Sequence, residues 1–116
     1  MDDKLRQRML EMLKPPTPLE AARSFLQSYV FDADLDTLEK TVRHMVSVNS
    51  RTIVQGVTGM EAILRTPLPP GTLASLVARD ANRSLDDPSD EGAAAWLADL
   101  AARVRQWMGH AAPAPE

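Results

Sequence analysis

The chain contains no cysteine among its 116 residues. This absence excludes disulfide bonds and thiolate metal sites, and it is compatible with a reducing compartment. Long apolar runs are also missing, since no stretch approaches the roughly 18 residues that a membrane-spanning helix requires. The first residues, MDDKLRQRML, carry charges throughout, which is not typical of a secretory signal. We therefore expect a cytoplasmic protein that does not act at a membrane.

The chain has no excess of positive charge. Its 13 Lys and Arg residues against 16 Asp and Glu residues give a net charge of −3, with an isoelectric point near 5.3. A nucleic-acid binder normally carries a basic surface that neutralises phosphates. The composition therefore disfavours nucleic acid as a partner and is compatible with a basic protein partner.

Motifs that carry enzymatic chemistry are also missing. His44 and His110 are the only histidines, and neither belongs to an HExxH or similar metal-binding spacing. No serine lies in a GxSxG context, and Gly56 and Gly59 do not form a phosphate-binding loop. The acids of residues 86–91 fail the EF-hand spacing. We therefore predict no catalytic residue, no cofactor and no metal, and hence a protein that is not an enzyme.

Aromatic residues are scarce, at 4% of the chain, so the core must consist mostly of Leu, Val, Ala and Met. Both tryptophans fall within residues 85–108, which contain the longest helical pattern. Asp87 followed by Pro88 is typical of a helix start, and Gly109 is typical of a helix end. One apolar stripe is formed at helical spacing by Ala93, Trp96, Leu97, Leu100, Val104, Trp107 and Met108.

This stripe predicts the centre of the core. We expect Asp99 and Arg103, four residues apart, to pair on the opposite, solvent-facing side of the helix. The buried side chains of the stripe should be Trp96, Leu97, Leu100 and Val104. Their predicted packing partners are Leu26, Leu38, Val42, Leu73 and Leu76.

Further helix starts precede this stretch. Residues 17–20 (TPLE) have the spacing of a capping box, with proline at the first helical position. The same spacing recurs at residues 36–39 (DTLE) and 58–61 (TGME), and Thr72 is a candidate cap for a short helix. We expect the helix that starts at Asp36 to end before Gly56 or Gly59.

Residues 46–57 leave an alternative open. They are rich in Val, Ile, Thr, Ser and Asn, which are weak helix formers. A small hairpin that turns at Asn49 and Ser50 is therefore an alternative to a helix in this segment.

The breaks along the chain predict its organisation. Residues 3–13 place Leu5, Met9, Leu10, Met12 and Leu13 at helical spacing, before two prolines end the pattern. We therefore expect an N-terminal helical arm over residues 1–16, a helical domain over 17–109 and a flexible tail over 110–116. The fold class is predicted to be all-α, a small irregular bundle of five or six helices.

Several acids cluster near the expected loops and helix ends: Asp32, Asp34, Asp36, Asp80, Asp86 and Asp87. They are either solvated loop and cap residues or parts of one face that meets a basic protein. Trp107, near the end of the last helix, either packs in the core or binds a partner.

Two segments carry a resemblance to a known family. LPPGTLASLVARDANRSLDDPSDEGAAAWLADLAARV (residues 68–104) resembles the C-terminal part of immunity proteins of bacterial contact-dependent growth-inhibition systems. FLQSYVFDADLD (residues 25–36) resembles the aromatic and acidic stretch near the start of these proteins, although the family's His and Trp are missing from residues 29–34.

The resemblance implies a non-enzymatic cytoplasmic protein that binds and neutralises the toxin domain of a large secreted effector. Toxin domains of this kind are frequently nucleases with basic active-site clefts, which an acidic partner can occlude. The alternative is a helical adaptor or structural subunit, for which a homo-oligomer is one form. The residues predicted to bind the toxin are Asp32, Asp34, Asp80, Asp86, Asp87 and Trp107.

Overall fold

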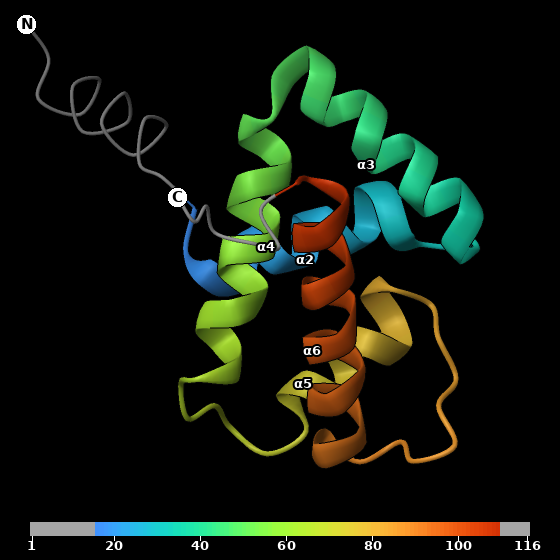
Figure 1. Ribbon diagram of the computed structural model, residues 1–116. Helices are drawn as coiled ribbons and strands as arrows, with labels where there is room; N and C mark the ends of the chain where they lie inside the picture. Colours follow the sequence, from blue (N-terminus) through green and yellow to red (C-terminus); the bar gives the residue numbers. More distant parts are fainter. Residues whose placement is uncertain (1–15, 110–116) are drawn as a thin grey trace, which may run out of the picture.

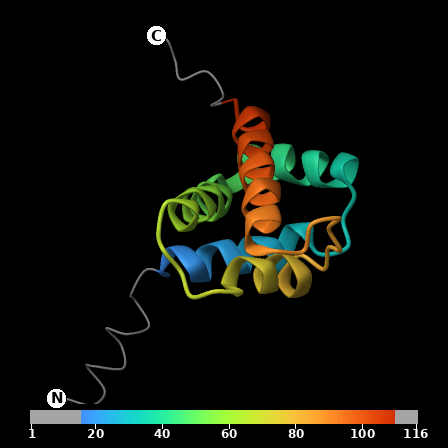
Figure 2. The ribbon, with the colours of Figure 1, turned by 90° about the horizontal axis from the view of Figure 1, so that it is seen from below.

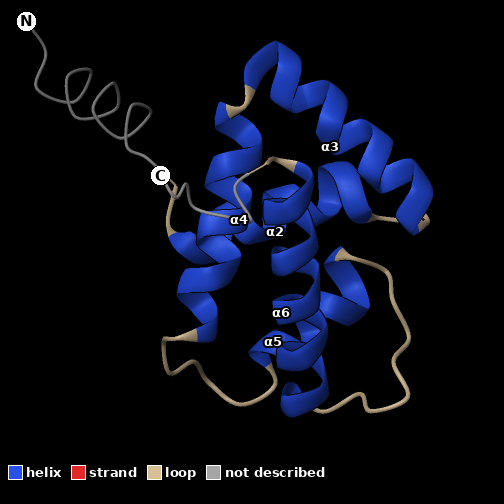
Figure 3. Cartoon of the chain, in the orientation of Figure 1, coloured by secondary structure: helices blue, strands red, loops and turns tan. Residues whose placement is uncertain are grey.

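Helices joined by loops make up the part of the chain that the structure describes, residues 16–109 of a computed structural model (Figures 1 and 3). The elements are α2 (Pro18–Phe25), η1 (Leu26–Val30), α3 (Leu35–Asn49), α4 (Arg51–Leu64), α5 (Thr72–Ser75), η2 (Leu76–Asp80) and α6 (Asp90–Trp107). No strand occurs in this range, so the all-α prediction is confirmed. The helix predicted for residues 3–13 and the tail predicted for 110–116 lie outside the described residues.

The start of α2 follows from its local sequence. Thr17 Oγ1 accepts a hydrogen bond from the Glu20 amide at 3.1 Å, and the Glu20 carboxylate accepts one from the Thr17 amide at 2.9 Å. The capping box predicted for residues 17–20 is therefore confirmed. The helix continues into η1, a π-helical turn that closes with a hydrogen bond from the Phe31 amide to the Leu26 carbonyl.

Residues 46–57 are helical on both sides of a break at Ser50, so the hairpin alternative is wrong. The predicted helix end near Gly56 or Gly59 is wrong as well, because α4 runs through both glycines to Leu64. Tertiary packing explains their position in a helix. A Cβ built on Gly56 would lie 2.6 Å from Phe25 Cβ, so only glycine lets α4 approach α2 this closely.

Three other helix starts differ from the prediction. Asp34, and not Asp36, caps α3, by accepting from the Thr37 amide at 2.7 Å. Residues 58–61 lie inside α4, so the box spacing there starts no helix. The N-cap of α5 is Gly71 and not Thr72.

The α6 helix begins two residues later than predicted, with Ser89 as its N-cap. Asp87 does not cap the helix directly, because its carboxylate accepts from the amide and the hydroxyl of Ser89, at 3.1 and 2.6 Å. The predicted end is confirmed, since Gly109 follows Met108 with a φ of 80°. The predicted pair of Asp99 and Arg103 is present at 2.8 Å.

Helix α6 packs against α3, α4 and α5 and supplies one side of the core (Figures 1 and 2). Leu97, Leu100 and Val104 are buried as predicted, whereas Trp96 is only partly buried at the edge of the core. All five predicted partners belong to the same core, although Leu73 is only partly buried. The largest fully buried side chains outside α6 are Phe25, Leu26, Leu38, Ile53, Met60, Leu76, Val30, Val42, Val57 and Val77.

Candidate functional site

The turn between η1 and α3 is tied to the segment that follows η2. Asp32 and Asn82 both have left-handed backbone conformations, with φ values of 60° and 54°. Asn82 Nδ2 donates a hydrogen bond to Asp32 Oδ1 at 2.9 Å. Arg83 Nη2 donates to the carbonyl of Val30 at 3.3 Å and also to the carbonyl of Ala33. These contacts hold the turn in place although the two segments are about 50 residues apart in sequence.

Asp34 keeps a negative charge at this turn. The hydrogen bond from the Thr37 backbone amide is the main cause that lowers the pKa of Asp34, and the charges of Lys40 and Arg83 lower it further. The side chain lies at the surface while it caps α3. The carboxylate is therefore ionised at neutral pH and available to a cationic partner.

Two large apolar side chains flank Asp32 and Asp34 in the sequence. Phe31 is 48% exposed and Leu35 is 52% exposed, next to Asp32 and Asp34 respectively. We call these four residues the acidic edge. Val48, 68% exposed on α3, is the remaining exposed large apolar side chain among residues 16–109. Two carboxylates set between two exposed apolar side chains are a combination suited to a protein interface.

A groove of about 270 Å³ opens beside the acidic edge. Trp96 and Asp99 of α6 line it opposite Asp34 and Leu35 of the edge. The full set of lining residues is Val30, Asp34, Leu35, Leu38, Arg83, Trp96, Asp99 and Leu100. The partly buried Trp96 therefore offers part of its ring to the groove, where an apolar or cationic side chain of a partner can contact it.

The structure places the six predicted toxin-binding residues in different surroundings. Asp32 and Asp34 share the acidic edge. Asp80 stabilises the fold, because its side chain is only 15% exposed, pairs with Arg23 Nε at 3.5 Å and accepts from Gln27 Nε2 at 2.6 Å. Asp80 therefore offers little surface to a partner.

The remaining three residues lie at the two opposite ends of α6. Asp86 and Asp87 are exposed in the loop before α6, and hydrogen bonds from the Ser89 hydroxyl and amide lower the pKa of Asp87. Trp107 is partly buried at the other end of α6, against the core. A helix of this length spans about 27 Å, so Trp107 and Asp87 do not form one contact point.

Phe31 and Leu35 were not among the residues predicted from the sequence. In the sequence they are two apolar residues in an acidic loop, and apolar residues are usually assigned to the core. The available signal was their spacing: they flank a pair of acids, of which Asp34 caps the next helix, and such positions often stay at the surface.

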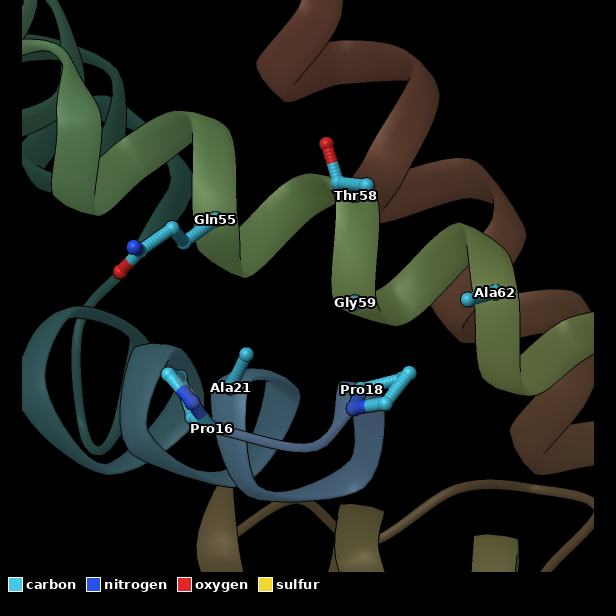
Figure 4. A pocket seen from close by; sticks show the side chains of 7 residues that line it. All are labelled: Pro16, Pro18, Ala21, Gln55, Thr58, Gly59 and Ala62. Carbon is cyan, nitrogen blue, oxygen red and sulfur yellow. The ribbon is translucent and has the colours of Figure 1, made fainter. Parts of the chain in front are cut away.

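A second groove, of about 200 Å³, lies between α2 and α4 (Figure 4). Its lining is Pro16, Pro18, Ala21, Gln55, Thr58, Gly59 and Ala62, with no charged side chain among them. Gly59 lets α4 approach α2 closely at the floor of the groove. A Cβ at this position would lie 2.6 Å from the Pro18 carbonyl oxygen and 3.0 Å from Ala21 Cβ. Small side chains on both helices therefore leave a shallow, neutral groove.

Within residues 16–109, no group of three or more His, Asp or Glu side chains is placed to hold a metal ion. No helix in that range is long and apolar enough to cross a membrane. Comparisons of the chain with protein-family models, with curated proteins and with solved structures give no match.

Proposed function

We propose that this protein is an immunity protein, which binds and neutralises the toxin domain of a contact-dependent growth-inhibition effector. The observation that carries the proposal is the acidic edge, where exposed Phe31 and Leu35 flank the carboxylates of Asp32 and Asp34. The sequence resemblance of residues 25–36 and 68–104 supplies the biological context. Both segments contribute to this region, since Arg83 and Asn82 hold the turn that carries the edge.

The carboxylates and the apolar side chains of the acidic edge have different roles in the proposed interface. The carboxylates attract a basic cleft, such as that of a nuclease, and accelerate association. The apolar side chains are desolvated on contact and slow dissociation. The protein acts by occupying the toxin's cleft in the cytoplasm, without chemistry of its own and without binding nucleic acid.

The first test measures binding to the cognate toxin domain after the charges of the edge are removed. Asp32→Asn/Asp34→Asn is a suitable variant because Asn tolerates the left-handed φ at position 32 and can still cap α3 at position 34. We expect slower association and a weaker dependence on salt, with unchanged thermal stability.

The matched control is Asp86→Asn/Glu91→Gln, which removes the same charge from exposed residues near the start of α6. If both variants bind like the parent at two salt concentrations, the acidic edge is not the interface, and the end of α6 around Trp107 becomes the next candidate. Slower association in both variants to the same degree would indicate steering by net charge alone.

The second test removes the apolar anchors. Phe31→Ala/Leu35→Ala should dissociate faster and lose about tenfold or more in affinity, because exposed side chains that become buried on binding carry most of the energy. Val48→Ala is the control, since Val48 is also exposed but lies elsewhere on α3. Sedimentation of the protein alone distinguishes toxin binding from the alternative function. Self-association that disappears in the double variant would favour a homo-oligomeric helical subunit.

A further inference from the structure

We propose that the groove between α2 and α4 binds the N-terminal segment of the same chain, through an apolar stripe within residues 1–13. The groove is neutral and apolar, and its first lining residue is Pro16, where the described chain begins (Figure 4). The described part of the chain therefore begins at the edge of the groove itself. This inference concerns a different surface from the acidic edge and does not rest on the proposed function.

The sequence of the segment matches an apolar groove. At 100° per residue, Leu5, Met9 and Met12 fall within about 60° of one another on a helix, and Leu13 lies beside them. Lys4, Gln7 and Glu11 fall on the opposite face. A helix of this length gains little stability alone in water, so burial of the stripe would stabilise it.

The connection has a suitable length for this contact. Only residues 14–17 separate the end of the stripe from α2, and connections of two to about five residues commonly join antiparallel helices. The segment can therefore fold back along α2 and reach the groove. Met9 and Met12 suit a shallow groove, because unbranched thioether side chains adapt their shape to irregular surfaces.

The walls of the groove are small and uncharged, which suits the apolar stripe of the N-terminal segment. Ala21 on α2 and Ala62 on α4 present only methyl groups, and Gly59 presents none, so a second helix can approach closely. No charged side chain lines the groove, so no ionised group is desolvated when the stripe docks. A partner with strongly charged contact residues would find no counter-charge here.

The absence of cysteine allows a direct test on the full chain. In Met9→Cys/Gln55→Cys, the second thiol stands at an exposed position that lines the groove. The measurement is the rate of disulfide formation on mild oxidation. We expect crosslinking about tenfold faster than in the same pair with Leu5→Gln/Met12→Gln added, because docking raises the local concentration of one thiol at the other above that of a flexible tether.

A matched control adds Lys4→Gln/Glu11→Gln to the same cysteine pair, on the face opposite the stripe, and should leave the rate unchanged. The added substitutions all lie outside residues 16–109, so the variants compared differ only in the N-terminal segment, and thermal unfolding checks that the domain is equally folded in each. Equal rates with and without the stripe would overturn the proposal. A disulfide that joins two chains, recognised by its mass and its dependence on protein concentration, would also overturn it and assign the groove to a second copy.

Discussion

Arg105 of α6 donates two hydrogen bonds to Glu61 of α4, from Nε to Oε2 at 3.0 Å and from Nη2 to Oε1 at 2.8 Å. Nη2 also donates to Thr58 Oγ1 at 3.3 Å. The two charged side chains are 28% and 31% exposed, so water screens them less than it screens a pair at the surface. This fork joins two helices whose contact residues are 44 positions apart in sequence.

We expect Arg105→Gln to lower the free energy of unfolding by roughly 1–2 kcal/mol, because two charge-assisted hydrogen bonds between helices are lost. Arg103→Gln is the matched control on the same helix. It breaks only the pair with Asp99, whose side chains are 45% and 65% exposed, and should cost at most about 0.5 kcal/mol. Urea denaturation of both variants measures the difference, and equal losses would contradict the prediction.

Because of the pair of Glu61 and Arg105, we expect the stability of the fold to depend on pH. Hydrogen bonding from Arg105 lowers the pKa of Glu61 below its ordinary value of 4.5. A carboxyl whose pKa is lowered on folding stabilises the fold above its unfolded pKa, and this contribution disappears as the pH falls through the folded pKa. We expect stability to fall below about pH 4.5 and Glu61→Gln to make that fall less steep. An unchanged slope in denaturation series between neutral and acidic pH would refute this.

Gly56→Ala should destabilise the protein, although the same change at an open helical position usually stabilises by about 0.5–1 kcal/mol. The added Cβ would lie 2.6 Å from Phe25 Cβ, so the two helices must move apart. We expect a loss of roughly 1–3 kcal/mol. In the double variant with Phe25→Leu, the two losses should not add, and thermal unfolding of the four proteins of this cycle tests that coupling.

Leu100→Ala tests the core face of α6. Leu100 is 3% exposed within the core, so its truncation should cost about 2–5 kcal/mol. Val48→Ala, at an exposed position of α3, should change the free energy of unfolding by no more than about 0.5 kcal/mol. A loss for Leu100→Ala as small as that of the control would show that another face of α6 supports the core.

Asp90 stabilises a helix other than its own. Its two carboxylate oxygens accept from the amides of Gly71 and Ala74 at the start of α5, at 2.7 and 2.9 Å, and these bonds lower its pKa. In Asp90→Ala the exchange of these two amide hydrogens should accelerate. Glu91→Ala, at the next position, should leave their exchange unchanged. Hydrogen exchange resolved by NMR measures both, and continued protection in Asp90→Ala would contradict the role.

Local chemistry in the sequence determined much of the helical architecture. The capping box at Thr17 and Glu20, the pair of Asp99 with Arg103 and the end at Gly109 depend on residues no more than four positions apart, or on the conformation of one residue. Such interactions are readable because the helix fixes the spacing between partners. The 3.6-residue period likewise identified the buried face of α6.

Tertiary structure decided the features whose partners are distant in sequence. Gly56 and Gly59 resemble helix ends locally, but they lie within α4 because α2 packs against them too closely for any side chain. In the sequence Asp80 looks like a free surface acid, whereas in the fold its carboxylate contacts Arg23 and Gln27.

In the candidate site, too, some features follow from the local sequence and others depend on partners that are distant in sequence. Its acids could be predicted because Asp32 and Asp34 lie next to a helix start, where carboxylates are common. The exposure of Phe31 and Leu35 could not, since an apolar side chain is buried or exposed according to what packs on it. Asn82 and Arg83 bind the turn from about 50 residues away, and that pairing arises only when η1 and η2 come together in the folded chain.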